Sequence, residues 1–125
     1  MKSSAMPERL KIERFLIKWQ KRLGLQDWDI TVDFRDARDM NQHPGKTAIQ
    51  ENIQTADIRI MALDDRQKCD PADADPELDI VHELVHIRLW SIDPPKNAER
   101  TLHICREQAI EWIAKALVKL DRRKK

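Results

Sequence analysis

The chain has 125 residues, of which 41% are hydrophobic and 36% are charged, and its 23 lysines and arginines nearly balance its 22 aspartates and glutamates. That length suits one hydrophobic core, and the formal net charge of +1 argues against a nucleic-acid binder, which would gather a basic excess on one face. No stretch is apolar enough for a membrane span or a signal peptide, so we expect a cytoplasmic protein with no membrane partner. We predict a single domain over residues 1–125, with its core at residues 7–121 and a solvated basic tail at residues 122–125.

The first predicted element is an amphipathic helix over residues 7–23, where apolar side chains recur at three- and four-residue spacings. Pro7 suits the first turn of this helix, and Gly24 suits its C-terminal end. The expected buried stripe consists of Leu10, Ile12, Phe15, Leu16, Trp19 and Leu23.

Strands are predicted next. Residues 28–35 alternate apolar and polar side chains, which is typical of a half-buried strand. Residues 36–46 show no period and contain a Pro-Gly pair, which predicts a loop. Further strands are expected at residues 46–50 and 55–63, so the sheet should have about three strands.

A second long helix is predicted to begin at Asp75-Pro76-Glu77, after an acidic connection over residues 64–77. Asp75 can cap the first free amides, Pro76 can occupy the first helical position, and Glu77 complements the positive end of the helix dipole. The paired prolines within residues 91–97 should end this helix.

The last predicted helix runs from residue 97 to residue 121, and the elements together give an α+β fold. The helix should bury one stripe, formed by Leu102, Cys105, Ala109, Ile113, Leu117 and Leu120. Core or semi-buried packing is expected for the four tryptophans, Trp19, Trp28, Trp90 and Trp112. Cys69 and Cys105 lie outside any Cys-x-x-Cys pattern, so free thiols are favoured, and a single bridge between them is the alternative.

The chemistry-bearing motif is "HELVH", residues 82–86, on the second long helix. Residues four apart share one face of a helix, so His82 and His86 can direct their imidazoles at one metal ion. Glu83 lies about 100° round the helix, where it can take the proton of a water that the ion activates. The alternative is a pair of ordinary histidines on a buried helix. Burial of two imidazoles and a carboxylate without a metal, however, would leave polar groups without hydrogen-bond partners.

A catalytic zinc site needs a third protein ligand and an open position. The glycine and third histidine of the metzincin extension are absent after His86, so the ligand should come from the last helix. Relative to the expected buried stripe, Glu107 lies on the flank of that helix and Glu111 points almost directly away. Glu107 is therefore the preferred ligand and Glu111 the second choice. Two histidines and a carboxylate favour zinc over iron, cobalt or manganese.

The stretches "DPELDIVHELVHIRLWSID" and "REQAIEWIAKALVKL" resemble the zincin metallopeptidases, specifically the small gluzincin-like domains found among phage and prophage proteins. The strands "WDITVDF" and "TADIRIMAL" are similar to the strand pattern of the same core. The resemblance implies zinc ligands His82, His86 and Glu107, with Glu83 as the catalytic base. By the same analogy, an edge strand, from residues 55–61 or 46–50, would pair with an extended peptide.

The chain departs from that family in one respect, because it has no tyrosine to stabilise the oxyanion. His103 is the first candidate for this role, and Arg88 and His43 are others. The leading hypothesis is a zinc metallopeptidase that acts on a peptide or protein substrate. The alternatives are a zinc-binding phage-type accessory protein without peptidase activity and a metal-free interaction domain.

Overall fold

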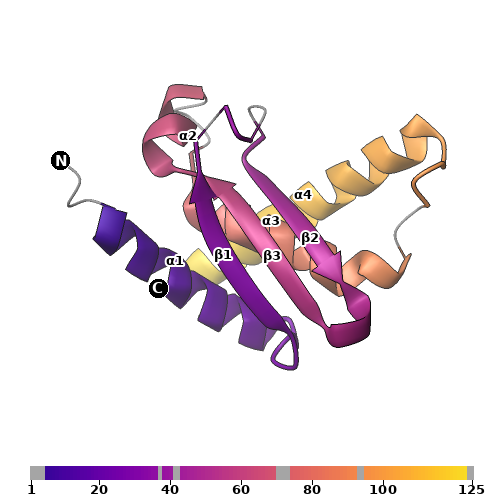
Figure 1. The fold of residues 1–125 in the computed structure, drawn as a ribbon, viewed down its shortest axis with the longest axis horizontal. Helices are drawn as coiled ribbons and strands as arrows, with labels where there is room; N and C mark the ends of the chain where they lie inside the picture. The colour runs from indigo at the N-terminus through magenta and orange to yellow at the C-terminus, as the bar shows by residue number, and fades with distance from the viewer. Residues whose placement is uncertain (1–4, 37, 41–42, 70–73, 93–94, 124–125) are drawn as a thin grey trace.

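The computed structural model describes residues 5–36, 38–40, 43–69, 74–92 and 95–123, and it has the expected α+β fold (Figure 1). Two short 3-10 turns, at Glu51–Ile53 and Trp90–Ile92, join longer elements. The longer elements are α1 (Ala5–Arg22), β1 (Asp29–Arg35), β2 (Gly45–Gln50), β3 (Thr55–Met61), α2 (Leu63–Cys69), α3 (Pro76–Leu89) and α4 (Arg100–Arg123). Among the described residues, no helix is both long enough and apolar enough to cross a membrane.

The three strands form a mixed sheet in the order β1-β3-β2. β1 runs parallel to β3, with Val32 beside Ile58, and β2 runs antiparallel to β3, with Thr47 beside Ile58. Ile58 and Ile60 are buried on the helix-facing side, as the predicted alternation requires. Because β3 is central, the expectation that residues 55–61 might offer a free edge is wrong. Of the two candidate strands, only β2 lies at an edge.

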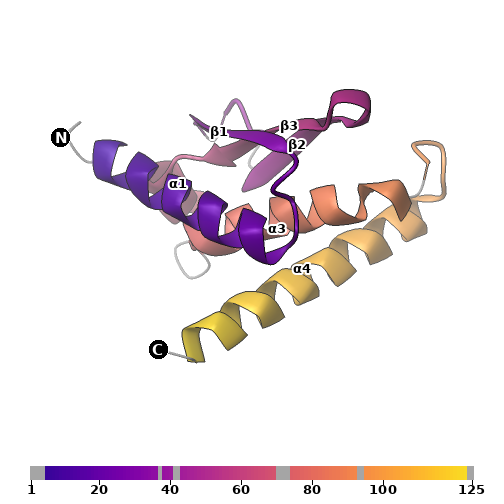
Figure 2. The same cartoon turned by 90° about the horizontal axis from the view of Figure 1, so that it is seen from below.

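Helix α3 lies at the centre of the molecule, with the sheet and α1 on one side and α4 on the other (Figure 2). Its start follows the prediction, because Asp75 Oδ1 accepts a 3.2 Å hydrogen bond from Leu78 N and proline occupies the first turn. Its side chains are buried around most of the circumference, which explains why it shows little amphipathic pattern. The fully buried apolar residues are Ile80, Val81, Leu84 and Ile87.

Helix α1 packs on α3 through Ile12, Leu16 and Trp19, although the predicted Leu10 is 52% exposed. The helix ends at Arg22, and Gly24 follows it as the expected C-terminal stop, with a φ of 69° that is accessible to glycine without strain. The expected burial of the tryptophans holds for Trp19, which is 2% exposed. Trp28 and Trp90 are half-buried.

A group of ion pairs joins α1, the start of α3 and the end of α4. Lys18 Nζ lies 2.7 Å from Glu77 Oε2 and 3.0 Å from Asp121 Oδ2, and Arg22 also pairs with Asp121. Arg122 contacts Asp75 at 2.9 Å. The prediction of a solvated tail at residues 122–125 is therefore wrong for Arg122, because α4 continues through residue 123.

Two further predictions about the elements are wrong. The segment expected to be a connection begins with α2, because Asp64 and Asp65 favour the first turn of a helix and Lys68 favours its last. The stripe predicted to be buried on α4 is largely on the outside, with Leu102 53% and Leu120 55% exposed. Trp112, which was expected to be in the core or semi-buried, is 73% exposed. The inner face of α4 instead buries Ile110, Ala114, Val118 and Asp121.

The ion-pair group predicts a pH-dependent loss of stability. Hydrogen bonds from Arg22 and Lys18 lower the pKa of Asp121 from 3.8 to about 2. Because the folded pKa lies below the unfolded one, the ionised carboxylate stabilises the fold above pH 3.8, and this contribution is lost as the pH falls to about 2. Asp121→Asn should therefore lower the Tm at neutral pH, and the difference from the wild type should shrink over that interval.

Thermal melts followed by circular dichroism, between neutral pH and about pH 2, measure this difference. Asp27→Asn, at an exposed turn position, is the matched control and should leave the Tm nearly unchanged. A deficit in the Asp121 variant that stays constant down to the lowest pH would contradict the assignment.

Candidate metal centre

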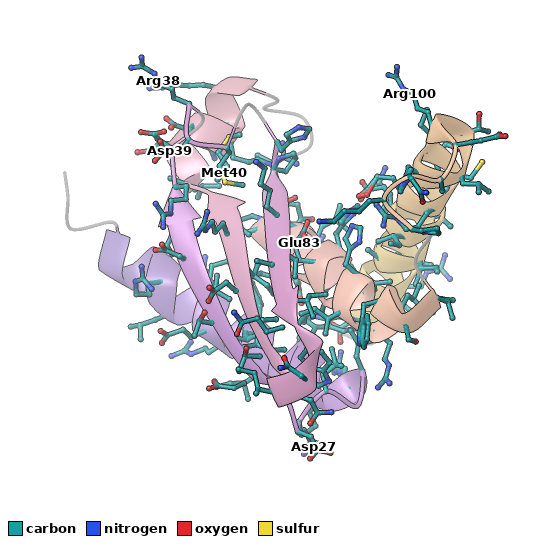
Figure 3. All side chains as sticks on the ribbon, turned by 45° about the vertical axis from the view of Figure 1, so that its right-hand side comes forward. Asp27, Arg38, Asp39, Met40, Glu83 and Arg100 are labelled. Atoms are coloured by element: carbon teal, nitrogen blue, oxygen red, sulfur yellow. The ribbon has the colours of Figure 1, made fainter. Side chains whose placement is uncertain are left out.

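A cavity of about 840 Å³ lies between β2, α3 and α4, and the predicted motif opens into it. Glu83, labelled in Figure 3, comes from α3 and lies beside the β2 strand. Sixteen described residues from these elements, the preceding loop and α2 line the cavity. The residues important for its chemistry are Thr47, Asp79, His82, Glu83, His86, Glu107 and Glu111.

His82 and His86 share one face of α3, with ring centroids 5.0 Å apart. The Glu107 carboxylate of α4 lies between them, because its Oε1 is 3.0 Å from His82 Nε2 and 2.9 Å from His86 Nε2. The three groups can each offer one ligand atom, and these atoms lie within 4.8 Å of one another. The fold therefore brings together the three residues predicted as metal ligands.

Glu111 does not point away from the site, as the sequence had suggested. Its Oε1 lies 2.7 Å from Nδ1 of His82, one helical turn beyond Glu107. The prediction failed because it took the wrong stripe of α4 as the buried one. With Ile110 and Ala114 facing α3, both glutamates border the same packed face and project toward the motif.

Three carboxylates determine the protonation of His82. Burial alone would lower the pKa of its imidazole, but the Glu107 hydrogen bond, the charge of Glu83 and the Glu111 hydrogen bond raise it to about 9. Carboxylates only accept hydrogen bonds, so Nδ1 and Nε2 both donate and the ring is cationic in this arrangement. The hydrogen bonds from His82 and His86 in turn lower the pKa of Glu107.

Glu83 is buried against the sheet, with 5% of its surface exposed. Thr47 Oγ1 of β2 donates a 2.6 Å hydrogen bond to its Oε1, while burial raises the pKa of this carboxyl group. A Cβ atom at Gly45 would lie only 2.7 Å from Glu83 Oε2, so glycine allows β2 to approach this closely. Glu83 is thus held next to the two imidazoles by a neighbouring strand.

A buried ion pair in the cavity wall was missed by the sequence analysis. Arg66 of α2 donates to Asp79 of α3, from Nε to Oδ2 at 3.0 Å and from Nη2 to Oδ1 at 3.3 Å. Burial raises the pKa of Asp79 to about 6 in spite of this pair. Asp79 lies one turn before Glu83, so its position on the same face as the motif could have been predicted from the sequence. Arg66 could not, because its segment was predicted to be a connection and not a helix.

The three predicted oxyanion donors have different positions. His43 lines the cavity. Arg88 donates instead to the carbonyl oxygens of Leu23 and Gly24, at 3.2 Å each. His103 is not among the described residues that line the cavity.

Comparisons with protein-family models, curated proteins and solved structures find no match to this chain. Cys105, one of the two predicted free thiols, is an exposed free cysteine on α4, and the side chain of Cys69 lies outside the part of the chain that the structure describes.

The close approach of β2 to Glu83 predicts a coupled effect on stability. Gly45→Ala should lower the free energy of unfolding by about 1–3 kcal/mol, because the new methyl group overlaps the buried carboxylate. The same change made in a Glu83→Ala background should have a much smaller effect, since the overlapping atoms are gone. Urea titrations of the four proteins in this double-mutant cycle measure the coupling, and equal effects in the two backgrounds would argue against it.

Proposed function

We propose that the protein is a zinc-dependent metallopeptidase of minimal size, similar to the gluzincin-like domains, and that it acts in the cytoplasm on peptide or protein substrates. The observation that carries the proposal is the convergence of His82 Nε2, His86 Nε2 and Glu107 Oε1 within 4.8 Å, with Glu83 beside them. A structural zinc site would need four protein ligands, whereas a catalytic site has three and an open position.

The donor set fits zinc. Two imidazole nitrogens and one carboxylate oxygen form a common catalytic ligand set for this ion. A cation at the His82 Nε2 position would replace the proton that this nitrogen donates to Glu107 and would leave the Nδ1 hydrogen bond to Glu111 in place. When bound, zinc supplies Lewis-acid activation of water and polarises the carbonyl group that is attacked.

Glu83 is the proposed general base. Its burial raises its pKa and thereby strengthens it as a base for the attacking water. In the reaction, Glu83 takes a proton from that water and passes it to the nitrogen of the leaving amine, while the water oxygen forms a bond to the carbonyl carbon and the C–N bond breaks. Thr47 holds the Glu83 carboxylate from the side of β2.

Glu111 acts through His82. Metal-ligating histidines usually donate their second ring N–H to a carboxylate or carbonyl, which fixes the tautomer and the ring orientation. The 2.7 Å contact between His82 Nδ1 and Glu111 Oε1 has this form. Glu111 is therefore a positioning residue in the proposal and not the third ligand.

The sheet edge supports a peptide substrate. β2 pairs with β3 along one side only in the described sheet, and Gly45, Thr47 and Ile49 line the cavity. An extended peptide that hydrogen-bonds to the free edge of β2 would place a carbonyl group near Glu83. His43, in the loop before β2, is the one predicted oxyanion donor among the cavity-lining residues.

Zinc binding is the first expectation to check. The purified protein should bind one equivalent of zinc, and His86→Ala should abolish this binding. Glu111→Ala should weaken the affinity by about 10- to 100-fold, because His82 loses its orienting partner. Competition titration against a chromophoric chelator measures the affinity, with the exposed Glu99→Ala as the matched control. An unchanged zinc affinity in Glu111→Ala would contradict the proposal that Glu111 positions His82.

Replacing the base tests hydrolysis itself. Glu83→Gln should lower kcat/KM on a denatured protein or peptide-library substrate by about 10²- to 10⁴-fold while zinc stays bound, because no ligand is removed. The exposed Glu13→Gln on α1 is the control and should keep full activity.

Two results would overturn the peptidase proposal. Hydrolysis at the wild-type rate by Glu83→Gln would show that another group is the general base or that a contaminating enzyme hydrolyses the substrate. A wild-type protein that binds zinc but hydrolyses nothing would favour the zinc-binding accessory protein instead.

A further inference from the structure

Figure 2 shows that one side of α4 faces α3 and that its other side faces away from the rest of the described chain. Apolar side chains on this outer side are exposed. Leu102 is 53% exposed, Trp112 73%, Ile113 41% and Leu120 55%. These residues recur at helical spacing with other exposed small or apolar side chains. We call the set the outer α4 face; it consists of Leu102, Cys105, Ala109, Trp112, Ile113, Ala116 and Leu120.

Helix α4 thus has two apolar faces, and the fold uses only one. Ile110, Ala114 and Val118 on the inner face are at most 4% exposed. The outer α4 face includes most of the stripe that the sequence predicted to be buried, so its pattern is that of an interior surface. A contiguous apolar patch of this kind on a small protein marks an interaction site, whereas scattered exposed apolar residues need no explanation.

Positive charge borders this surface on one side. Lys115, Lys119 and Arg122 follow one another at spacings of four and three residues, which places them along one flank of the helix. From Trp112 to Leu120 the sequence carries no carboxylate. The flank is therefore basic, although the whole chain has a formal net charge of only +1.

The same flank forms one wall of a groove of about 430 Å³ between the start of α3 and the end of α4. Leu78 and Val118 contribute apolar surface to it, and among the described residues that line it the one acid, Asp75, is bound by Arg122. The other charged residues of the groove are Lys115, Lys119 and Arg123. A groove lined by lysine and arginine side chains, next to the apolar outer α4 face, fits a ligand that presents carboxylates beside apolar side chains.

We propose that the outer α4 face and this groove bind an acidic amphipathic helix of a partner protein. Its apolar side chains would cover Trp112 and Leu120, and its carboxylates would pair with Lys115 and Lys119. The outer α4 face lies on the opposite side of the helix from Glu107, so the proposal does not depend on hydrolysis. On its basic border, Lys115 also pairs with Glu111, with Nζ 3.5 Å from Oε2, so the substitutions that test the surface are made at Trp112 and Lys119.

Two other occupants fit less well. A second copy of the chain, paired antiparallel through α4 about Trp112, would bring Lys115 near Ala109 and Lys119 near Cys105, so neither lysine would lie opposite a carboxylate. A membrane surface is flat, whereas the basic residues here line a hollow on one flank only. Charge and shape together favour the acidic helix.

Binding of a designed helix tests the proposal. The probe is a fluorescein-labelled peptide of about 20 residues with leucines along one face and glutamates on both flanks, and its partner probe carries lysines in place of the glutamates. Fluorescence anisotropy with the full chain should show the acidic peptide binding at least about tenfold more tightly. Trp112→Glu and Lys119→Glu should each weaken it by about tenfold or more, and added salt should weaken it further.

Two exposed positions on α1 provide matched controls. Ile17→Glu and Lys11→Glu make the same chemical changes away from α4 and should leave binding unchanged. All four altered side chains are exposed, and circular dichroism melts of each variant establish that the fold is kept.

Several outcomes would overturn the proposal. Equal binding of the two peptides, or binding that survives both α4 substitutions, would show that the surface does not select an acidic helix. Flotation with vesicles of phosphatidylserine and phosphatidylcholine, lost in Trp112→Glu, together with no peptide binding, would assign the surface to a membrane. A dimer seen by sedimentation and dissolved by Trp112→Glu would assign it to a second copy.

Discussion

The burial of α3 is the constraint on which the rest of the structure depends. This helix has the sheet and α1 on one side and α4 on the other, and most of its residues are buried. Yet it carries Asp79, His82, Glu83 and His86 on adjoining turns. Polar groups inside a protein need hydrogen-bond partners, so the neighbouring elements must supply them. The elements around α3 are arranged so that their side chains supply these hydrogen-bond partners.

These partners come from three different elements. α2 supplies Arg66 to Asp79, β2 supplies Thr47 to Glu83, and α4 supplies Glu107 and Glu111 to the histidines. The site is therefore inseparable from the packing of the domain. Sliding of α4 along α3 would break the contacts that Glu107 and Glu111 make with the imidazoles, and the tightly packed Ile110 and Ala114 resist such a movement.

Much of the fold could be predicted because the signals were local. The alternation over residues 28–35 predicted β1, and the Asp75-Pro76 pair predicted the start of α3, since a cap and a first-turn proline act within one turn of the chain. The face of α4 could not be predicted in this way. That helix has two apolar stripes, and periodicity alone does not say which of them meets the core. Choosing the outer stripe put Glu111 on the wrong side.

By itself, the sequence determined the α+β elements and the placement of His82 and His86 on one face of a helix, because four residues make about one helical turn whatever surrounds them. Only the tertiary structure decided which acids meet those histidines, that Thr47 and Gly45 lie against Glu83, and that α4 keeps an uncovered apolar side. These contacts join residues up to 38 positions apart. They depend on how whole elements dock, and no local pattern in the chain encodes the docking angle.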